Sequence, residues 1–299
     1  MMVIWRIVDG RRGHDNQSLG LVKALSRHVS CVSHDIPVSS FKSGLWSYLL
    51  KKYSPGDSLP KPHLIVGAGH GTHLHLLCAR RAYGGRTVVI MKPSLPTAFF
   101  DFCLIPDHDN PRITDSIIIT RGALNAITPG KYHDSGYGLI MVGGPSRHFG
   151  WDDNQLSGQI GLILKTSNNI TWHITDSPRT PASTSHNLAG LGLENVIFHS
   201  HKNTGMDWAT NQLLKSGYVW VTEDSMSMIY ESLTAGAATG LLRVPLQRQG
   251  KLTNCIQNLI SNNMITSFED WKNGKQLTPP DDILDEANRC AEYLLEKIK

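Results

Sequence analysis

The most constraining feature of this 299-residue chain is a strand–helix–strand pattern near its carboxyl end. Residues 218–221 form a short apolar run typical of a buried strand, residues 226–235 show helical apolar spacing, and residues 239–243 form a second apolar run. Two strands joined by one helix pair in parallel, because the crossover returns the chain to the same end of the sheet. The segment therefore predicts a parallel α/β sheet with ligands at the carboxyl ends of its strands.

The same alternation runs through the rest of the chain in two series. In the first series we predict strands at residues 3–8, 64–66, 87–91, 102–105 and 117–119, and a helix at residues 16–28. In the second we predict strands at residues 139–142, 170–174, 196–199, 218–221 and 239–243. The helices of the second series are predicted at residues 154–165, 183–189, 207–216, 226–235 and 251–261.

Each series is long enough to build a domain of its own. Residues 124–136 contain Pro129, Gly130 and Gly136 and few apolar side chains, so we expect the link between the domains there. The predicted domains are residues 1–130 and 131–280. Residues 281–299 show apolar side chains at helical spacing, and we expect this last helix to pack back on the first domain.

Composition limits the possible classes of protein. Hydrophobic residues make up 40% of the chain and charged residues 18%, which is typical of a globular protein. The formal net charge of +4 comes from scattered Lys and Arg, so we expect no nucleic acid partner. Five cysteines without a CxxC pair indicate reduced thiols and a cytoplasmic location. The amino end lacks the features of a signal peptide, and no apolar run approaches the ~18 residues of a membrane span, so membrane contact would be peripheral at most.

A predicted helix start follows the strand at residues 218–221. Glu223, Asp224 and Ser225 supply capping side chains, and the free N–H groups and dipole of a helix start favour an anion such as phosphate. Glu231 lies one to two turns further on, within reach of a ribose diol on a ligand bound there. The alternative interpretation is a plain helix cap and a solvated face, which every parallel α/β protein has.

Two loops of the first series carry histidines among glycines. Residues 9–17 place Gly13, His14 and Asp15 just before the predicted helix, where His14 could act as a general base or simply be a loop imidazole that caps the helix or faces water. Residues 67–73 allow close backbone approach, but a dinucleotide-binding G-x-G-x-x-G pattern would need glycine where Thr72 stands. A nicotinamide-dependent enzyme is therefore disfavoured.

Two loops of the second series carry arginines at predicted strand ends. In residues 143–151, glycines would admit a phosphate, Ser146 could donate to it and Arg147 could neutralise it. A role for Ser146 as a hydrolase nucleophile is disfavoured, because G-x-S-x-G needs glycine where His148 stands. Arg179 follows the strand at residues 170–174, so the two arginines could balance a departing diphosphate. We expect no D-x-D motif and no His–Cys cluster of the kind that holds a metal, and therefore no metal and no other cofactor.

Several of these segments together resemble a known family. The segments are DGRRGHDNQSLGL at 9–21, ITRGALN at 119–125, GGPSRHFGW at 143–151, TDSPRTP at 175–181 and TEDSMSMIYESL at 222–233. In their order and spacing they resemble the mitochondrial-fission family named after the plant elongated-mitochondria protein. The wider resemblance is to GT-B glycosyltransferases, especially those that add N-acetylglucosamine to a lipid-linked peptidoglycan precursor.

The resemblance implies two Rossmann-like domains facing a cleft and assigns roles to residues. The catalytic base would be His14, with Asp15 as rival, on an acceptor side that includes Gly13, Gly69 and His70. The donor would be held by Gly144, Ser146, Arg147, Arg179, Ser225, Met226, Ser227, Glu231, Gln247 and Gln249. We therefore expect a metal-independent, inverting glycosyltransferase that moves a sugar from a nucleoside-diphosphate sugar to an acceptor. The expected acceptor is of the cell-envelope or glycolipid type, and lipid-linked acceptors belong to this class.

Two other functions remain open. The plant relative implies a non-catalytic protein that binds partners on a transferase-like fold, and one type of nucleotide-sugar epimerase also has the GT-B fold. Fold resemblance does not separate the three, because function resides in the site. A base, a diphosphate clamp and a ribose-binding acid together favour an enzyme over a scaffold.

Overall fold

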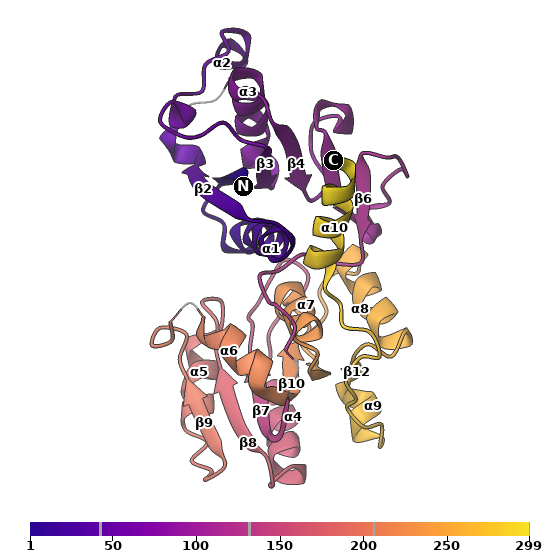
Figure 1. Ribbon diagram of the computed structural model, residues 1–299. Helices are drawn as coiled ribbons and strands as arrows, with labels where there is room; N and C mark the ends of the chain where they lie inside the picture. The colour runs from indigo at the N-terminus through magenta and orange to yellow at the C-terminus, as the bar shows by residue number, and fades with distance from the viewer. Residues whose placement is uncertain (42–43, 131–132, 206, 299) are drawn as a thin grey trace. The chain divides into compact units, whose positions relative to one another are not determined.

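The computed structural model describes residues 1–41, 44–130, 133–205 and 207–298, and the predicted α/β class with two parallel sheets is confirmed (Figure 1). The chain forms two compact units. The first unit is Met1–Ala126 with the segment from Asp285 onward, and the second is Ile127–Leu284. The boundaries thus lie at 126/127 and 284/285, where 130/131 and 280/281 were expected.

The first unit is built on a six-stranded parallel sheet of order β2-β1-β3-β4-β5-β6. Its strands are β1 (Met2–Val8), β2 (Cys31–Pro37), β3 (Leu64–Ala68), β4 (Arg86–Ile90), β5 (Phe102–Pro106) and β6 (Ile117–Thr120). Its helices are α1 (Arg12–His28), α2 (Leu45–Leu49), α3 (His73–Tyr83) and α10 (Glu286–Ile298), with short 3-10 turns at Val38–Ser40, Ser54–Gly56, His70–Thr72, Thr97–Phe99 and Asp107–Asp109. The sequence pattern does not reveal β2, whose outward face is polar, or α3, whose histidines and arginines mask its apolar stripe.

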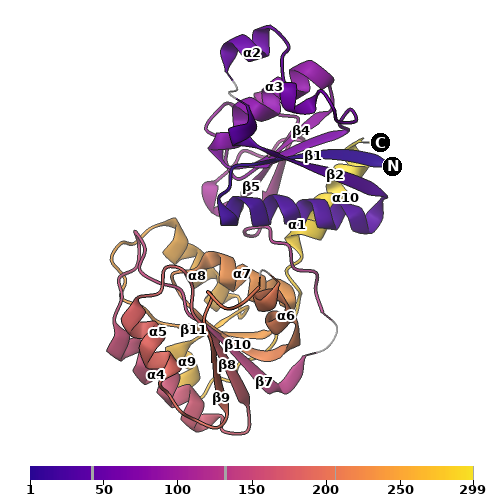
Figure 2. The ribbon, with the colours of Figure 1, turned by 90° about the vertical axis from the view of Figure 1, so that its left-hand side faces the viewer.

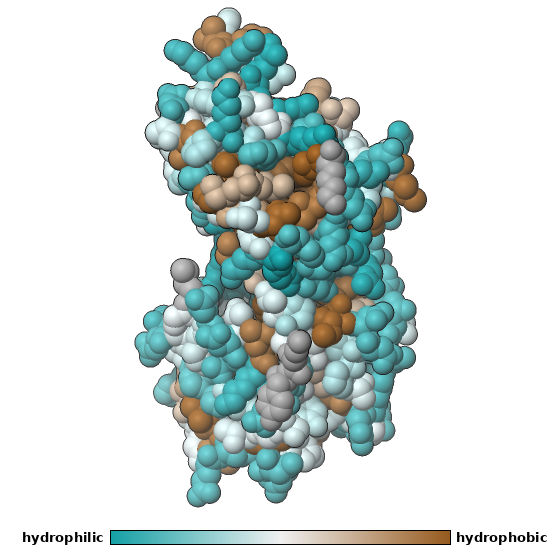
Figure 3. Space-filling model, in the orientation of Figure 1, coloured by the Kyte–Doolittle hydropathy of each residue, from teal (hydrophilic) through white to brown (hydrophobic). Residues whose placement is uncertain are grey.

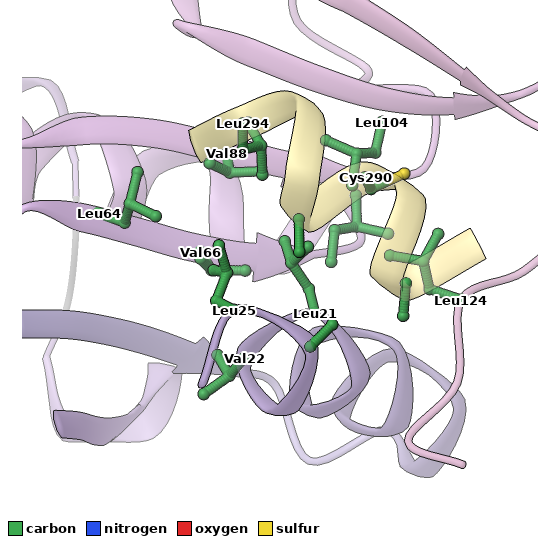
Figure 4. Packing of buried hydrophobic residues seen from close by; sticks show 14 of the residues in the cluster. Leu21, Val22, Leu25, Leu64, Val66, Val88, Leu104, Leu124, Cys290 and Leu294 are labelled. Atoms are coloured by element: carbon green, nitrogen blue, oxygen red, sulfur yellow. The ribbon is translucent and has the colours of Figure 1, made fainter. Parts of the chain in front are cut away.

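Helices cover both faces of this first sheet (Figure 2). Successive side chains of a strand point to opposite faces, so Leu64 joins one core and Ile65 the other. On one face Leu21 of α1 and Leu294 of α10 pack with Leu64 in a single buried cluster (Figure 4). The opposite core includes Ile65 and Leu76 of α3. The helix at the carboxyl end therefore completes the core of the first unit.

The second unit is built on a six-stranded parallel sheet of order β12-β11-β10-β7-β8-β9. Its strands are β7 (Asp134–Met141), β8 (Thr171–Thr175), β9 (Val196–His199), β10 (Ser216–Thr222), β11 (Ala238–Leu242) and β12 (Thr266–Ser267). Its helices are α4 (Asp153–Thr166), α5 (Ala182–Ala189), α6 (Trp208–Lys215), α7 (Met226–Ala235), α8 (Lys251–Ser261) and α9 (Phe268–Lys272).

Two tryptophans lie in the core of the second sheet against glycines of neighbouring strands. Gly138 pairs with Trp172, and a Cβ on this glycine would lie 2.4 Å from the indole ring. Gly240 pairs with Trp220 in the same way, and a Cβ there would lie 2.5 Å from the ring. The glycines give each indole room to lie flat across the adjacent strand, where both rings are almost fully buried.

Some predicted element ends differ from the structure. The first helix begins at Arg12 rather than residue 16, and the last begins at Glu286 rather than residue 281. Residues 134–136 of the expected link belong to β7, and residues 131–132 of that link lie outside the described residues. Ser216, expected at a helix end, starts β10. Within the described ranges, no helix is both long and apolar enough to cross a membrane.

The strand orders fix where ligands would bind. In the first sheet the chain steps from β1 to one side and then to β3 on the other, so the loops after β1 and β3 part at a topological switch point. In the second sheet β7 and β10 stand in the same relation. Ligands of open parallel sheets bind at such points, outside the carboxyl ends of the strands.

Candidate functional site

His14 lies at the switch point of the first sheet and is held by a carboxylate. Its Nδ1 lies 2.8 Å from Oδ2 of Asp9, the first residue after β1, and the side chains are 16% and 7% exposed. An ionised carboxylate only accepts hydrogen bonds, so Nδ1 donates and Nε2 keeps a lone pair that can accept a proton. The pair has the geometry of an oriented general base.

Gly69, in the loop after β3, gives the imidazole its place. A Cβ on Gly69 would lie 2.3 Å from Cε1 and 2.4 Å from Nδ1 of His14, and the backbone φ of Gly69 is +79°. Glycine is therefore needed here twice, for the left-handed backbone and for the close approach of the ring. The two histidine-containing loops of the sequence analysis are thus brought together by one contact.

A cavity of about 530 Å³ opens beside this imidazole. Its lining comes from the segments that follow β1, β3, β4 and β5, including the start of α1, namely Arg11, His14, Gly69, His70, Met91, Lys92, Pro93, Ser94 and Asp109. Met91 has a φ of 73°, which is strained for a residue that is not glycine, and such strain is common at functional sites. A small polar ligand would meet the imidazole, Lys92 and Ser94 there.

Gly13, His14 and Asp15 were expected in a loop before the first helix. They lie instead in the first turns of α1. Asp15 does not orient His14, because Asp9 does. The pKa of Asp15 is raised, mainly by burial and secondly by the nearby negative charge of Asp9. The backbone carbonyl of Asp15 accepts a hydrogen bond from Nη1 of Arg6 at 2.9 Å. Asp9 was not predicted as a site residue, although its place directly after a buried strand was a usable signal.

Asp109 of the cavity belongs to the one D-x-D sequence of this region, Asp107-His108-Asp109, which forms a short turn after β5. It lies in the first unit, and it contradicts the expectation that the chain contains no D-x-D sequence. The backbone carbonyl of Asp109 accepts from Nζ of Lys92 at 3.0 Å.

At the switch point of the second sheet, the glycines after β7 serve packing. The N–H of Gly143 donates to Oγ1 of Thr222 at 2.8 Å, and the N–H of Gly144 donates to Oδ2 of Asp224 at 3.1 Å. A Cβ on Gly144 would lie 2.0 Å from the carbonyl oxygen of Arg179. These N–H groups are engaged within the protein, so they hold the loops after β7, β8 and β10 together rather than face a phosphate.

Arg179 and Asp224 form the ion pair at the centre of these loops. Nη2 of Arg179 lies 2.7 Å from Oδ2 of Asp224, and Nη1 donates to the carbonyl of Gly144 at 2.8 Å. The Asp224 side chain is 0% exposed and that of Arg179 is 43% exposed. The charge of Arg179 is therefore already balanced, which leaves less of it for a diphosphate than the sequence suggested.

Arg147 and Ser146 are placed differently. Arg147 is exposed and makes no ion pair with any residue in the described part of the chain, so its charge is available to an anion. The Ser146 hydroxyl accepts from the N–H groups of His148 at 3.3 Å and Phe149 at 3.2 Å. No residue in the described ranges accepts its own proton, which can therefore be donated to a ligand.

The start of α7 borders the same switch point. Ser225 is the N-cap residue, is 8% exposed, and makes no capping hydrogen bond with its side chain. The first N–H groups of the helix, from Met226 and Ser227 on, have no acceptor within the helix, as at any helix start. Glu231 is half-buried in the second turn of this helix.

The loop after β11 packs against the loop after β7. The N–H of Gln247 donates to the carbonyl of His148 at 2.9 Å, and that of Gly150 donates to Pro245 at 2.7 Å. Gln247 and Gln249 are both exposed. The predicted donor residues are thus spread along one edge of the second sheet, at the ends of β7, β8, β10 and β11.

Two acidic groups at this edge were not predicted as site residues. Burial raises the pKa of Glu223 to about 7, against the opposing effect of Arg243. Burial would also raise the pKa of Asp176, but hydrogen bonds from His201 and Ser185 outweigh it and lower that pKa. Asp176 holds Nδ1 of His201 at 2.8 Å, which makes a second His–Asp pair.

Comparisons with known proteins agree with this architecture. The model of the family described as mitochondrial fission ELM1 matches residues 12–298. An uncharacterized protein of Rickettsia prowazekii (strain Madrid E) is 23% identical over 327 residues, which cover 90% of this chain and 91% of that protein.

Solved structures with a similar fold are GT-B-like. A UDP-GlcNAc 2-epimerase from Neisseria meningitidis, bound to UDP-GlcNAc, superposes with a TM-score of 0.57 at 12% identity, covering 99% of this chain and 100% of that one. MurG of Acinetobacter baumannii gives 0.54 at 12% identity, covering 100% and 99%. E. coli heptosyltransferase WaaC with ADP gives 0.50 at 10% identity, covering 87% and 99%. At these identities the likeness establishes the fold alone.

Proposed function

The chain belongs to the mitochondrial fission ELM1 family, and from this premise we propose that it is a glycosyltransferase that uses a nucleoside-diphosphate sugar. One observation carries the proposal. The imidazole of His14, oriented by Asp9, lines a cavity at the switch point of the first sheet with Nε2 able to accept a proton. A scaffold protein has no need of such an oriented base.

The first unit would serve the acceptor. Nε2 of His14 would take the proton of the acceptor hydroxyl as its oxygen bonds to the anomeric carbon. The bond between that carbon and the diphosphate oxygen would break, and the diphosphate would leave with the electron pair. Attack opposite to the leaving group would invert the anomeric configuration. Asp9 would stabilise the imidazolium that forms. For the acceptor, we propose a glycolipid-type molecule.

The second unit would serve the donor. Exposed Arg147, the proton of Ser146 and the N-terminus of α7 would meet the diphosphate, while Glu231 would bind the ribose. Gln247 and Gln249 would reach the sugar. Arg179 would act mainly through Asp224, by keeping the loops of this edge in place. These groups supply positive charge to the leaving diphosphate without a metal ion, and we propose that none is required.

The free cysteines support a reducing compartment. None of the five cysteines forms a disulfide, and four of them are buried. We propose that the protein works in the cytoplasm, where thiols stay reduced and nucleotide sugars are made.

Titration calorimetry with nucleoside diphosphates and their sugars tests the donor assignment. Glu231→Ala and Arg147→Ala should each weaken binding roughly tenfold to a hundredfold, because hydrogen bonds to charged groups contribute about 1.5–3 kcal/mol. Glu194→Ala, which changes an exposed carboxylate before β9, is the matched control and should bind normally. Absence of any nucleotide binding would favour the partner-binding scaffold instead.

A nucleotide-sugar epimerase is the second candidate. The carboxyl of Glu223, with its pKa raised to about 7, suits a proton transfer on the sugar itself. An epimerase would convert the nucleotide sugar without an acceptor, which NMR of the sugar detects directly. A transferase would release the diphosphate only when an acceptor is present, and excess chelator in the same assay tests the proposed metal independence.

A further inference from the structure

The short helix α2 presents large apolar side chains on the outside of the first unit. Leu45, Trp46, Leu49 and Leu50 are 70%, 76%, 56% and 65% exposed, and Tyr48 is 39% exposed. We call these residues the α2 patch. In Figure 3 the surface over α2, at the top of the view, shows brown next to teal. Soluble proteins rarely expose so many neighbouring apolar side chains unless the surface binds something.

Backbone hydrogen bonds within α2 and one contact with α3 hold this short helix. The N–H of Tyr48 donates to the carbonyl of Gly44 at 3.0 Å, and that of Leu50 donates to Trp46 at 2.9 Å. Cys78 of α3 contacts the carbonyl of Gly44 at 3.8 Å. The residue before the helix thus contacts α3, and the large apolar side chains of the helix remain exposed.

Unpaired positive charges border the patch. Lys51 and Lys52 directly follow it, both exposed, and the guanidinium of Arg81 on α3 lies 5.8 Å from the centre of the Tyr48 ring. Lys51, Lys52 and Arg81 form no ion pair with the described residues, in contrast to Arg80, which pairs with Asp101 at 3.2 Å. The patch therefore combines apolar and aromatic side chains with uncompensated cations.

We propose that the α2 patch docks this protein on a bilayer surface that contains anionic lipids. Trp and Tyr favour the level of the lipid headgroups, and leucines enter the boundary of the acyl chains. Lysine and arginine beside them meet the phosphates of anionic headgroups. A second copy of the chain or another protein would pair these cations with its own acidic groups. If such a partner covered the patch, the protein would bind anionic vesicles no better than neutral ones.

The proposal goes beyond the transfer reaction and is tested without it. The full chain is mixed with vesicles of phosphatidylcholine, alone or with phosphatidylglycerol, and the bound fraction is measured by flotation. We expect binding to the anionic vesicles and weak binding to the neutral ones. Added salt should weaken it, because salt screens the attraction between the cations and the headgroups.

Variants separate the apolar and the charged contributions. Trp46→Ser with Leu49→Ser, and Lys51→Glu with Lys52→Glu, should each weaken binding to anionic vesicles roughly tenfold or more. Phe99→Ser with Ile113→Ser is the matched control, since these side chains are 50% and 87% exposed elsewhere on the same unit. The control should bind like the unchanged protein, and all three variants should keep its melting temperature.

Three results would overturn the proposal. The first is that the unchanged protein binds neither kind of vesicle. The second is that the Trp46→Ser and Leu49→Ser variant binds as well as the control. The third is that the unchanged protein binds no vesicles but forms a dimer or a complex with a purified protein, and that the Trp46→Ser and Leu49→Ser variant no longer forms it. Nucleotide titrations are unaffected by these outcomes, so failure here leaves the proposed donor site standing.

Discussion

Arg179→Ala should destabilise the second unit, whereas Arg147→Ala should not, although sequence analysis gave both arginines the same role. The guanidinium of Arg179 lies 2.7 Å from the Asp224 carboxylate, whose side chain is 0% exposed. Its removal leaves a buried negative charge to which, among the described residues, one hydrogen-bond donor remains, the N–H of Gly144. Arg147 is exposed and unpaired among the described residues, so its loss leaves nothing buried.

The magnitude follows from the burial of the two partners. Exposed ion pairs contribute about 0–1 kcal/mol, while removing one partner of a buried pair costs about 3–5 kcal/mol. Asp224 is fully buried but Arg179 is 43% exposed, which places the pair between these limits. We expect a loss of about 3 kcal/mol for Arg179→Ala, or roughly 6–12 °C in melting temperature for a unit of this size. Arg147→Ala should stay within about 0.5 kcal/mol.

The assay is urea and thermal denaturation of four proteins that form a double-mutant cycle. They are the unchanged chain, Arg179→Ala, Asp224→Asn and the combination of the two. Because Asp224→Asn removes the buried charge, Arg179→Ala should cost only about 1 kcal/mol in that background. The difference between the two costs measures the coupling of the pair.

Two results would refute this reasoning. One is an Arg179→Ala protein as stable as Arg147→Ala. The other is a cost for Arg179→Ala that does not change in the Asp224→Asn background. Either would mean that Asp224 is not held as a charged partner of Arg179, and the role of Arg179 as a direct diphosphate ligand would be restored.

Three further predictions concern other groups. Asp9→Asn should slow transfer roughly a hundredfold or more in single-turnover assays with unchanged nucleotide affinity, and a collapse in Asp15→Asn alone would contradict this. Gly69→Ala should melt lower than Gly10→Ala, since both have positive φ (+79° and +77°) but only Gly69 would bring a Cβ within 2.3 Å of a side chain. The folded pKa of Glu223, about 7 against an ordinary 4.5, means that stability falls as pH rises from about 4.5 through 7. The Glu223→Gln variant should not show this fall. Its free energy of unfolding should exceed that of the unchanged protein by up to about 3 kcal/mol above pH ~8, but not near pH ~5. Equal dependence of stability on pH in the two proteins would contradict this prediction.

The amino-acid sequence by itself determined the fold class and most of its elements. Buried strands such as β3 and β10 are short apolar runs, and α7 has a complete apolar stripe, so local patterns identify them. Two series of such elements are enough to predict two parallel sheets. The sequence was less informative for β2, which has a polar outward face, and for the first turn of α1, where Gly13 and His14 suggested a loop.

The sequence also located the loops of the candidate site, because strand ends are visible as the points where apolar runs stop. It named His14, Ser146 and Glu231 from their residue types. It did not identify the partners that decide what these side chains can do. The pairing of Asp9 with His14 and that of Asp224 with Arg179 became visible only in the structure.

The physical reason is the order of the strands. Arg179 and Asp224 follow β8 and β10, which lie on either side of β7, so two loops 45 residues apart in the chain meet at one edge. Gly69 and His14 meet in the same way because β3 lies beside β1. Local propensity specifies each strand and helix, but which strands become neighbours depends on the packing of whole sheets. Charge balance, burial and close contact at the site are therefore set by tertiary structure, and with them the difference between Arg147 and Arg179.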